Sequence, residues 1–87
     1  MSSGKEERIL EIIKAMEELR EDSTVPRNVK TKLEASIGVL KNEGNEMRLR
    51  IDKVLQELDE VANDTNAQSY TRSQIWNIVS MLESVQN

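Results

Sequence analysis

The residues of this chain that could carry chemistry are mostly carboxylates, and several occur in pairs at helical spacing. Glu17 and Glu21 lie four positions apart, and Glu57 and Glu60 lie three apart. In a helix the members of each pair would share one face, as general acid–base catalysis or metal binding requires. Both pairs fall beside the apolar stripe of their segment, where they would face water. We interpret them as solvated helix faces.

Most other catalytic and metal-binding arrangements are excluded by residue types that the chain lacks. It contains no cysteine and no histidine, which removes disulfides, thiolate nucleophiles, most zinc sites and the histidine motifs of metal-binding helical bundles. The sequence also lacks glycine-rich phosphate loops and nucleophile elbows. We therefore expect no catalytic, cofactor-binding or metal-binding residues, and no enzyme activity.

Two polar segments, DSTVPRNV at 22–29 and DTNAQSYT at 64–71, each separate two amphipathic runs. In an up-and-down bundle the first and third connections lie at the same end, so these segments should approach each other. Helix N-termini at that end would suit an anion. The candidate binding end consists of Thr24, Arg27, Asn28, Lys30, Tyr70 and Arg72. The alternative, which we favour, is that these residues only cap helices and form turns.

A second candidate surface lies along the last amphipathic run, whose apolar arc is wider than one core-facing stripe needs. At about 100° per residue, Trp76 and Met81 flank that arc on opposite sides. At least one should stay accessible unless Leu10 or Leu49 covers it. Such a flank could bind a protein partner or, weakly, a second copy of the chain. More often, an edge tryptophan only covers the core and keeps its N–H in water.

Helical periodicity predicts the elements that would position these residues. Strand signals are missing, and the chain has one tryptophan, one tyrosine and no phenylalanine. Apolar residues instead recur every three or four positions in four runs, each predicting a helix of about 15 to 18 residues. The four stripes are Ile9, Ile12, Ile13, Met16 and Leu19; Leu33, Ile37 and Leu40; Met47, Ile51, Val54, Leu55, Leu58 and Val61; and Ile75, Ile78, Val79, Leu82 and Val85.

The four runs predict an all-α fold, a four-helix up-and-down bundle that forms one domain over residues 1–87. Two helical hairpins, at about 4–42 and 46–86, would make up its halves. Their stripes should meet in a single core. The side chains expected to be nearly inaccessible to solvent include Ile13, Ile37, Leu55 and Val79.

Short polar segments mark the predicted helix boundaries. Ser3 and Glu6 have the spacing of an N-terminal capping box. Pro26 disfavours a helical Val25, so it should stop the first helix and lie in the first turn of the second. Gly44 would supply a left-handed residue where the second helix ends.

A shift of 42 positions superposes the two predicted hairpins. Every main apolar position coincides, as Ile9 does with Ile51, and Asp22 falls on Asp64. The pattern predicts a duplicated helical hairpin with a HEAT-like period, although similar hairpins could also arise from general helix rules. Asp22 and Asp64 should then accept backbone N–H groups in corresponding turns.

A resemblance to known proteins is carried by TVPRN at 24–28 and TRSQIWNIVSMLE at 71–83, together with the acidic region between them. With these segments the chain resembles a family of short, uncharacterised archaeal proteins, and the resemblance covers nearly the whole chain. It implies a compact four-helix fold without an assigned activity or cofactor, and it carries over no catalytic residue. Relatives often place proline where Ala67 and Gln68 stand, which implies a looser connection here.

Net charge and hydropathy limit the partners. Sixteen acidic and twelve basic residues leave a formal charge of −4, which opposes binding to nucleic acid and anionic lipid. No apolar run suits a membrane span or a signal peptide, so we expect a cytoplasmic protein. The leading hypothesis is a non-catalytic protein-interaction or assembly module. The alternative is a nucleic-acid or nucleotide adaptor that uses Arg27, Lys30, Tyr70 and Arg72.

Overall fold

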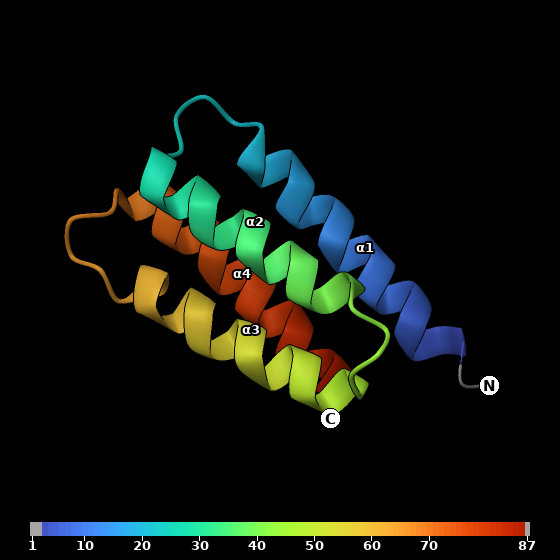
Figure 1. Cartoon of the computed structure of the whole chain (residues 1–87). Helices are drawn as coiled ribbons and strands as arrows, with labels where there is room; N and C mark the ends of the chain where they lie inside the picture. Colours follow the sequence, from blue (N-terminus) through green and yellow to red (C-terminus); the bar gives the residue numbers. More distant parts are fainter. Residues whose placement is uncertain (1–2, 87) are drawn as a thin grey trace.

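In the part of the chain that the structure describes, four helices follow one another, joined by three short connections (Figure 1). The computed structural model describes residues 3–86, with helices α1 (Ser3–Arg20), α2 (Arg27–Lys41), α3 (Met47–Ala62) and α4 (Ser69–Gln86). They contain 18, 15, 16 and 18 residues, which confirms the lengths predicted from apolar periodicity.

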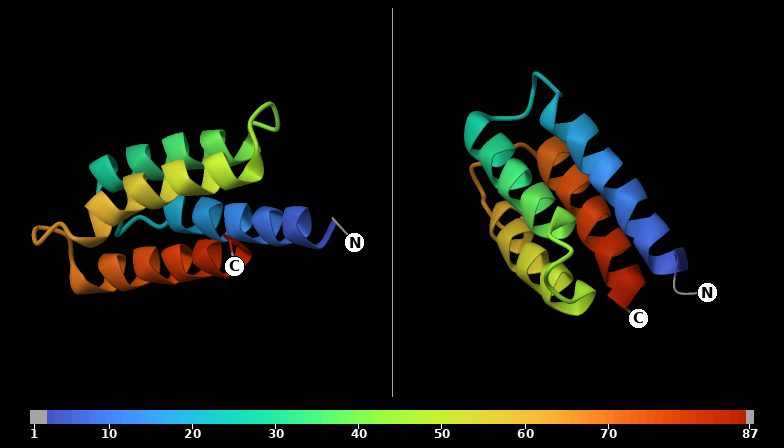
Figure 2. Two further views of the ribbon diagram at one scale, coloured as in Figure 1. Left: turned by 90° about the horizontal axis from the view of Figure 1, so that it is seen from below. Right: turned by 45° about the vertical axis from the view of Figure 1, so that its right-hand side comes forward.

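The helices form an up-and-down bundle in which each packs on its two neighbours: α1 and α3 both contact α2 and α4. In Figure 2, α2 and α3 form one layer, and α1 and α4 form the other. The first and third connections lie at one end, and the start of α1, the end of α4 and the second connection lie at the other. The predicted fold class is therefore confirmed.

A single apolar core fills the space between the two layers. Its most deeply buried side chains include Met16, Leu33, Leu58 and Leu82, one from each helix. Most of the core comes from the predicted stripes, and three buried residues lie outside them: Val25, Val29 and Ala62. Burying one side chain of this size stabilises the fold by about 1.5 to 3 kcal/mol before the loss of conformational entropy is counted. The four stripes therefore hold the bundle together.

Near-complete burial is confirmed for Ile13, Ile37 and Val79, but the prediction is wrong for Leu55. Leu55 is only partly buried against the core, whereas Leu58 is fully buried. The buried apolar stripe of α3 consists of Ile51, Val54, Leu58, Val61 and Ala62. At 100° per residue, Leu55 lies roughly 70° from the centre of that stripe, at its edge. Truncating Leu55 should therefore cost less than the roughly 2 to 5 kcal/mol typical of a fully buried leucine.

All three connections adopt the same turn. Asp22 accepts the backbone N–H groups two and three residues further on, the first with its carboxylate at 2.9 Å and the second with its carbonyl at 3.1 Å. Asp64 forms the same two bonds at the same distances. Asn42 forms them at 3.1 and 3.2 Å between α2 and α3. The predicted equivalence of Asp22 and Asp64 is confirmed, and it extends to a third turn.

The turns bear only partly on the predicted repeat. Asn42 makes the same turn between the two hairpins. The shared turn within each hairpin is therefore no evidence that one hairpin is a duplicate of the other. Val25 and Ala67, which are 42 positions apart, are both buried, whereas Asn45 at the corresponding place of the middle turn is exposed. This difference favours a correspondence between the hairpins, and the 42-residue repeat stays a prediction.

Two boundary residues differ in detail from the expectation. No glycine among residues 3–86 has a positive φ, so Gly44 is not a left-handed helix exit. Its N–H instead binds the Asn42 side chain, which sets the turn without a left-handed residue. Pro26 lies immediately before α2, at φ −61° and ψ 154°, and not within its first turn. In the third connection Gln68 stands at the position that corresponds to Pro26. The turn and helix-start hydrogen bonds to the Asp64 and Gln68 carbonyls still form there.

Arg50, in the first turn of α3, is a charged residue whose side chain is only 5% exposed. It donates hydrogen bonds to the Leu40 carbonyl at 2.7 Å and to the Glu6 carboxylate at 3.0 Å. Glu6 therefore joins α1 to α3. Its predicted capping-box partner, Ser3, has a side chain outside the described residues. Arg50 ties three helices together at the end of the bundle opposite the candidate binding end.

Candidate functional site

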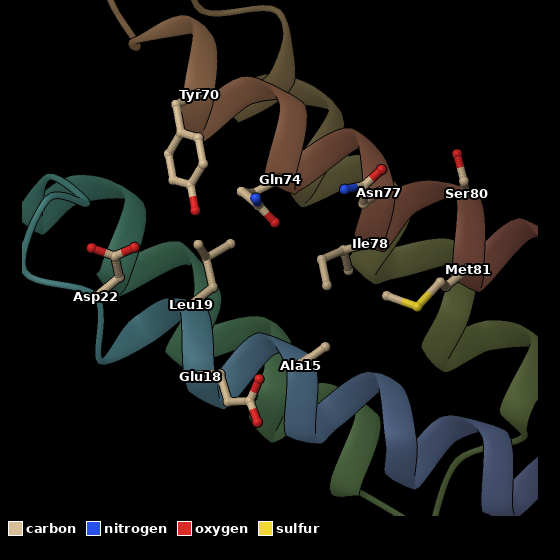
Figure 3. A pocket seen from close by; sticks show the side chains of 10 residues that line it. All are labelled: Ala15, Glu18, Leu19, Asp22, Tyr70, Gln74, Asn77, Ile78, Ser80 and Met81. Carbon is tan, nitrogen blue, oxygen red and sulfur yellow. The ribbon is translucent and has the colours of Figure 1, made fainter.

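An open groove of about 630 Å³ lies between α1 and α4, beside the first connection (Figure 3). Its apolar lining includes Leu19 of α1 and Ile78 of α4. The Tyr70 ring and the Met81 side chain reach from α4 toward α1 on either side of this apolar part. The groove thus brings together one residue from each of the two candidate surfaces.

Helical spacing explains why these side chains face each other. On α4, Tyr70, Gln74, Ile78 and Met81 follow one another at intervals of four, four and three residues, which keeps them on one face. Across the groove, Ala15, Glu18 and Leu19 of α1 and Asp22 just after it follow at intervals of three, one and three residues, which is also a helical spacing. Both polar and apolar residues of α1, of α4 and of the first connection therefore line the groove.

The groove continues along the helix junction beyond Met81. A second hollow of about 290 Å³, lined by Ile12 and Val85 among others, shares Ser80 and Met81 with the first. At its far side the Arg8 guanidinium donates a hydrogen bond of 2.7 Å to the Ser84 hydroxyl. The two hollows form one elongated groove, with the Met81 thioether near its middle.

The end of the groove beside the first connection is negatively charged. Glu18 and Asp22 line it, and Gln74 adds an uncharged amide. The Thr24 hydroxyl, 2.7 Å from the Asp22 carboxylate, is the main cause that lowers the pKa of Asp22 below its ordinary value. The Thr24 backbone N–H and the charge of Lys30 lower it further. Asp22 is therefore ionised at neutral pH.

The candidate binding end is divided among different parts of the surface. Tyr70 lines the α1–α4 groove, while Arg27 and Asn28 line a separate shallow hollow on α2. Thr24 is used within its turn, where its hydroxyl binds Asp22.

Lys30 and Arg72 are both half-buried near the starts of their helices. The charge of Lys30 acts on Asp22, and the Arg72 Nε is buried without a hydrogen-bond partner among the described residues. The first and third connections share one end as expected, but these side chains do not line one hollow. Ligand binding by the six residues together stays a prediction.

Trp76 and Met81 are both accessible, with 44% and 37% of their surface exposed. Met81 lines the groove, whereas Trp76 lies on the other flank of α4. Leu10 and Leu49, the two possible covers, are themselves exposed. The expectation that at least one flank of α4 remains accessible is confirmed.

The sequence did not predict the structural roles of two basic residues, Lys32 and Arg50. Lys32 Nζ lies 2.8 Å from Glu60 and 3.1 Å from Glu57, so this carboxylate pair binds a lysine of α2. The hydrogen bond to Glu60, followed by that to Glu57, raises the pKa of Lys32. The other residue is Arg50. Its position three residues after Met47 and one before Ile51 placed it at the edge of the apolar stripe, a signal that could have indicated burial.

Two further properties concern the described residues. Within residues 3–86, no group of three or more acidic side chains is arranged to hold a metal ion. None of the four helices combines the length and apolar character needed to cross a membrane.

The fold and groove define a small all-helical protein, a four-helix bundle with an open groove between α1 and α4. The model of an uncharacterised protein family, UPF0147, matches residues 1–85, and the chain belongs to this family. A UPF0147 protein of Methanosarcina mazei is 32% identical over 84 residues, which cover 97% of this chain and 90% of that protein. A UPF0147 protein of Methanocaldococcus jannaschii is 41% identical over 70 residues, covering 80% and 75%.

Solved structures of similar proteins have the same fold. The crystal structure of a UPF0147 protein from Thermoplasma acidophilum is similar with a TM-score of 0.88 and 34% identity, covering 93% of this chain and 95% of that one. A crystal structure described as a protein of unknown function has a TM-score of 0.83 and 39% identity, covering 92% and 91%. The predicted resemblance to a family of short archaeal proteins is confirmed.

Proposed function

We propose that this chain is a small, non-catalytic protein-interaction or assembly module of the cytoplasm. The observation that carries the proposal is that the core is complete while five large side chains stay exposed: Leu10, Leu49, Tyr70, Trp76 and Met81. A single exposed apolar residue is ordinary. Three of these five lie on α4, however, and tyrosine, tryptophan and methionine are the types enriched in protein interfaces. The lack of cysteine suits a reducing compartment.

The nucleic-acid or nucleotide adaptor has less support. Arg27, Lys30, Tyr70 and Arg72 are spread over separate parts of the surface. The formal charge of −4 also weakens attraction to phosphates.

The proposal is tested by affinity capture from an archaeal lysate with the native chain and with Trp76→Glu and Met81→Glu, each with and without nuclease. Because both side chains are partly exposed, the variants should remain folded, which circular dichroism checks. We expect a stoichiometric protein partner that survives nuclease and is lost from at least one α4 variant. An interface anchor of this kind is typically worth about 2 kcal/mol or more.

The matched control is Gln56→Glu, which adds the same charge at an exposed position of α3 without removing an apolar side chain. It should retain the partner. Capture that depends on nucleic acid would favour the adaptor. Absence of any retained partner, together with a monomer in sedimentation equilibrium, would contradict the interaction module.

A further inference from the structure

The α1–α4 groove has a counterpart on the opposite layer of the bundle, between α2 and α3. A shift of 42 positions places Gln74 on Lys32 and Glu18 on Glu60. The same shift places Asp22 on Asp64. Each helix junction therefore has corresponding residues, although only one of the two junctions is closed by an ion pair.

In the α2–α3 junction the Lys32 ammonium is held between two carboxylates, 2.8 Å from Glu60 and 3.1 Å from Glu57. In the α1–α4 junction, Gln74 takes the place of the lysine and brings no charge. Glu18 and Asp22 line the groove there, and neither forms an ion pair among residues 3–86. Of the two carboxylates that hold Lys32, only Glu60 has a counterpart in the groove, Glu18, and Asp22 adds a carboxylate on which the charge of Lys30 acts. No lysine or arginine lies among the residues that line the larger hollow of the groove.

The rest of the groove suits the stem of a basic side chain and its apolar neighbours. Leu19 and Ile78 provide apolar contacts for methylene groups, and the Tyr70 ring offers a face for a cation. Met81, shared by both hollows, extends the apolar surface along the junction. Thioether side chains adapt to varied apolar partners.

We infer that the α1–α4 groove binds a lysine or arginine side chain of a partner protein, presented by an amphipathic segment whose apolar residues lie over Ile78 and Met81. The cation is held at the Glu18 and Asp22 end. This inference rests on the proposed interaction function and names the chemistry of the partner. Charge complementarity identifies the occupant, and the Lys32 ion pairs within the same chain show how such a cation is held.

The probe is a short alanine-based amphipathic helix that carries leucines on one face and two lysines, with a fluorophore for anisotropy. Its control has norleucine in place of both lysines, which keeps the aliphatic stem but removes the charge. We expect the lysine peptide to bind more tightly, with affinity that falls as salt rises. The double variant Glu18→Gln and Asp22→Asn should weaken it by roughly five- to tenfold, the combined effect of two partly exposed ion pairs. The amide oxygen that Asp22→Asn introduces would keep the turn acceptor.

The most informative variant is Gln74→Lys, which places a lysine at the position that corresponds to Lys32, with Glu18 at the position of Glu60. The second carboxylate of the α2–α3 junction, Glu57, corresponds to Ala15 and is not reproduced. Its ammonium should pair with Glu18 and occupy the site, so lysine-peptide binding should fall to the level of the double variant while the thermal midpoint is not lowered. Gln56→Lys adds the same charge on the exposed face of α3 and should change binding much less. Nuclear magnetic resonance should show that the peptide shifts the amide signals of Gln74 and Ile78.

Several outcomes would overturn the inference. These are equal binding of the lysine and norleucine peptides, no effect of Gln74→Lys, or no binding to the folded native chain. If lysate partners still depend on Met81 or Trp76, the interaction function stands and only the basic occupant is wrong. Absence of any lysate partner, together with a monomeric chain, would remove both the interaction function and the basic occupant. If the native chain self-associates and Gln74→Lys abolishes this self-association, the occupant of the groove is a second copy of the chain. The proposal of a different partner protein would then be wrong.

Discussion

The two helix junctions within the layers of this bundle share one pattern but differ in how tightly they close. The α2–α3 junction is more extensive than the α1–α4 junction, which carries the open groove. Where α2 has the small, fully buried Ser36 and the half-buried Val39, α4 has Ile78 and Met81 at positions 42 residues further on. The bulkier pair suits a wider junction, because side-chain size at the contact influences the distance between packed helices.

Polar residues at the edges of the stripes strengthen this contrast. Arg50 and Lys32 bridge α3 to α2, and Arg50 reaches α1 as well. Across α1 and α4, the corresponding Arg8 makes one exposed hydrogen bond to Ser84. The same apolar spacing can therefore build a junction closed by ion pairs or one with an open groove. The residues just beside the stripe decide which of the two forms.

The largest effect should come from replacing the arginines that occupy corresponding places in the two junctions. Arg50→Ala should lower the free energy of unfolding by about 2 to 4 kcal/mol, since it removes two charge-assisted hydrogen bonds and leaves the Leu40 carbonyl without its donor. Arg8→Ala breaks one exposed contact and should cost under about 1 kcal/mol. Chemical denaturation measures both values.

Arg50→Met serves as the control because it keeps most of the aliphatic packing and removes only the polar contacts. It should recover part of the stability that Arg50→Ala loses. Equal losses for Arg50→Ala and Arg8→Ala would show that the closed junction does not depend on its buried arginine.

A smaller effect is expected from Lys32→Gln, which gives the α2–α3 junction the amide that α4 has at Gln74. Hydrogen bonds to Glu60 and Glu57 raise the pKa of Lys32 above 10.5. A raised pKa means that the ion pairs stabilise the fold fully below pH 10.5, and that this contribution is lost as pH rises through the pKa of the folded state. The native chain should therefore lose more stability than Lys32→Gln in alkaline buffer.

Thermal unfolding over neutral to alkaline pH measures this difference, and Glu60→Gln tests whether the two residues act together. The double variant should lose less than the sum of the single losses. Parallel alkaline profiles for the native chain and Lys32→Gln would rule out a stabilising role for the pair.

The smallest effect concerns Asp22, at the charged end of the groove. The Thr24 hydroxyl and backbone N–H hold the pKa of Asp22 below 3.8. A lowered pKa means that the ionised carboxylate stabilises the turn above pH 3.8, and that this contribution disappears as pH falls through the pKa of the folded state. Asp22→Asn keeps an acceptor oxygen but should remove this part of the acid dependence, as acid titration of the thermal midpoint would show. An unchanged acid profile would contradict it.

Much of the fold could be predicted because it depends on local spacing. Positions such as Ile9 and Ile12 mark a helix face whatever the rest of the chain does, and Pro26 and Asp22 mark a boundary through their own backbone chemistry. Burial at the edges of the apolar stripes could not be predicted in the same way. Leu55 and Arg50 both lie beside the stripe of α3, yet the apolar residue is partly exposed and the charged one is buried.

The candidate site was predictable only in fragments. Tyr70 and Met81 were each identified, but for different surfaces, and their meeting in one groove depends on how far α1 stands from α4. Glu18 and Gln74 carried no signal of their own. Their interest comes from lining one groove from helices that are distant in the sequence, and from the contrast with Lys32 and Glu60.

The sequence by itself determined that four amphipathic helices would form, roughly where each would end, and that one apolar core would join them. These properties follow from a helical repeat of about 3.6 residues and from the chemistry of single turn residues, both of which act over a few positions. The tertiary structure decided which edge side chains are buried, which carboxylates find a cation and which junction stays open. Those outcomes depend on the sizes and charges of side chains that only the packing of separate helices brings together.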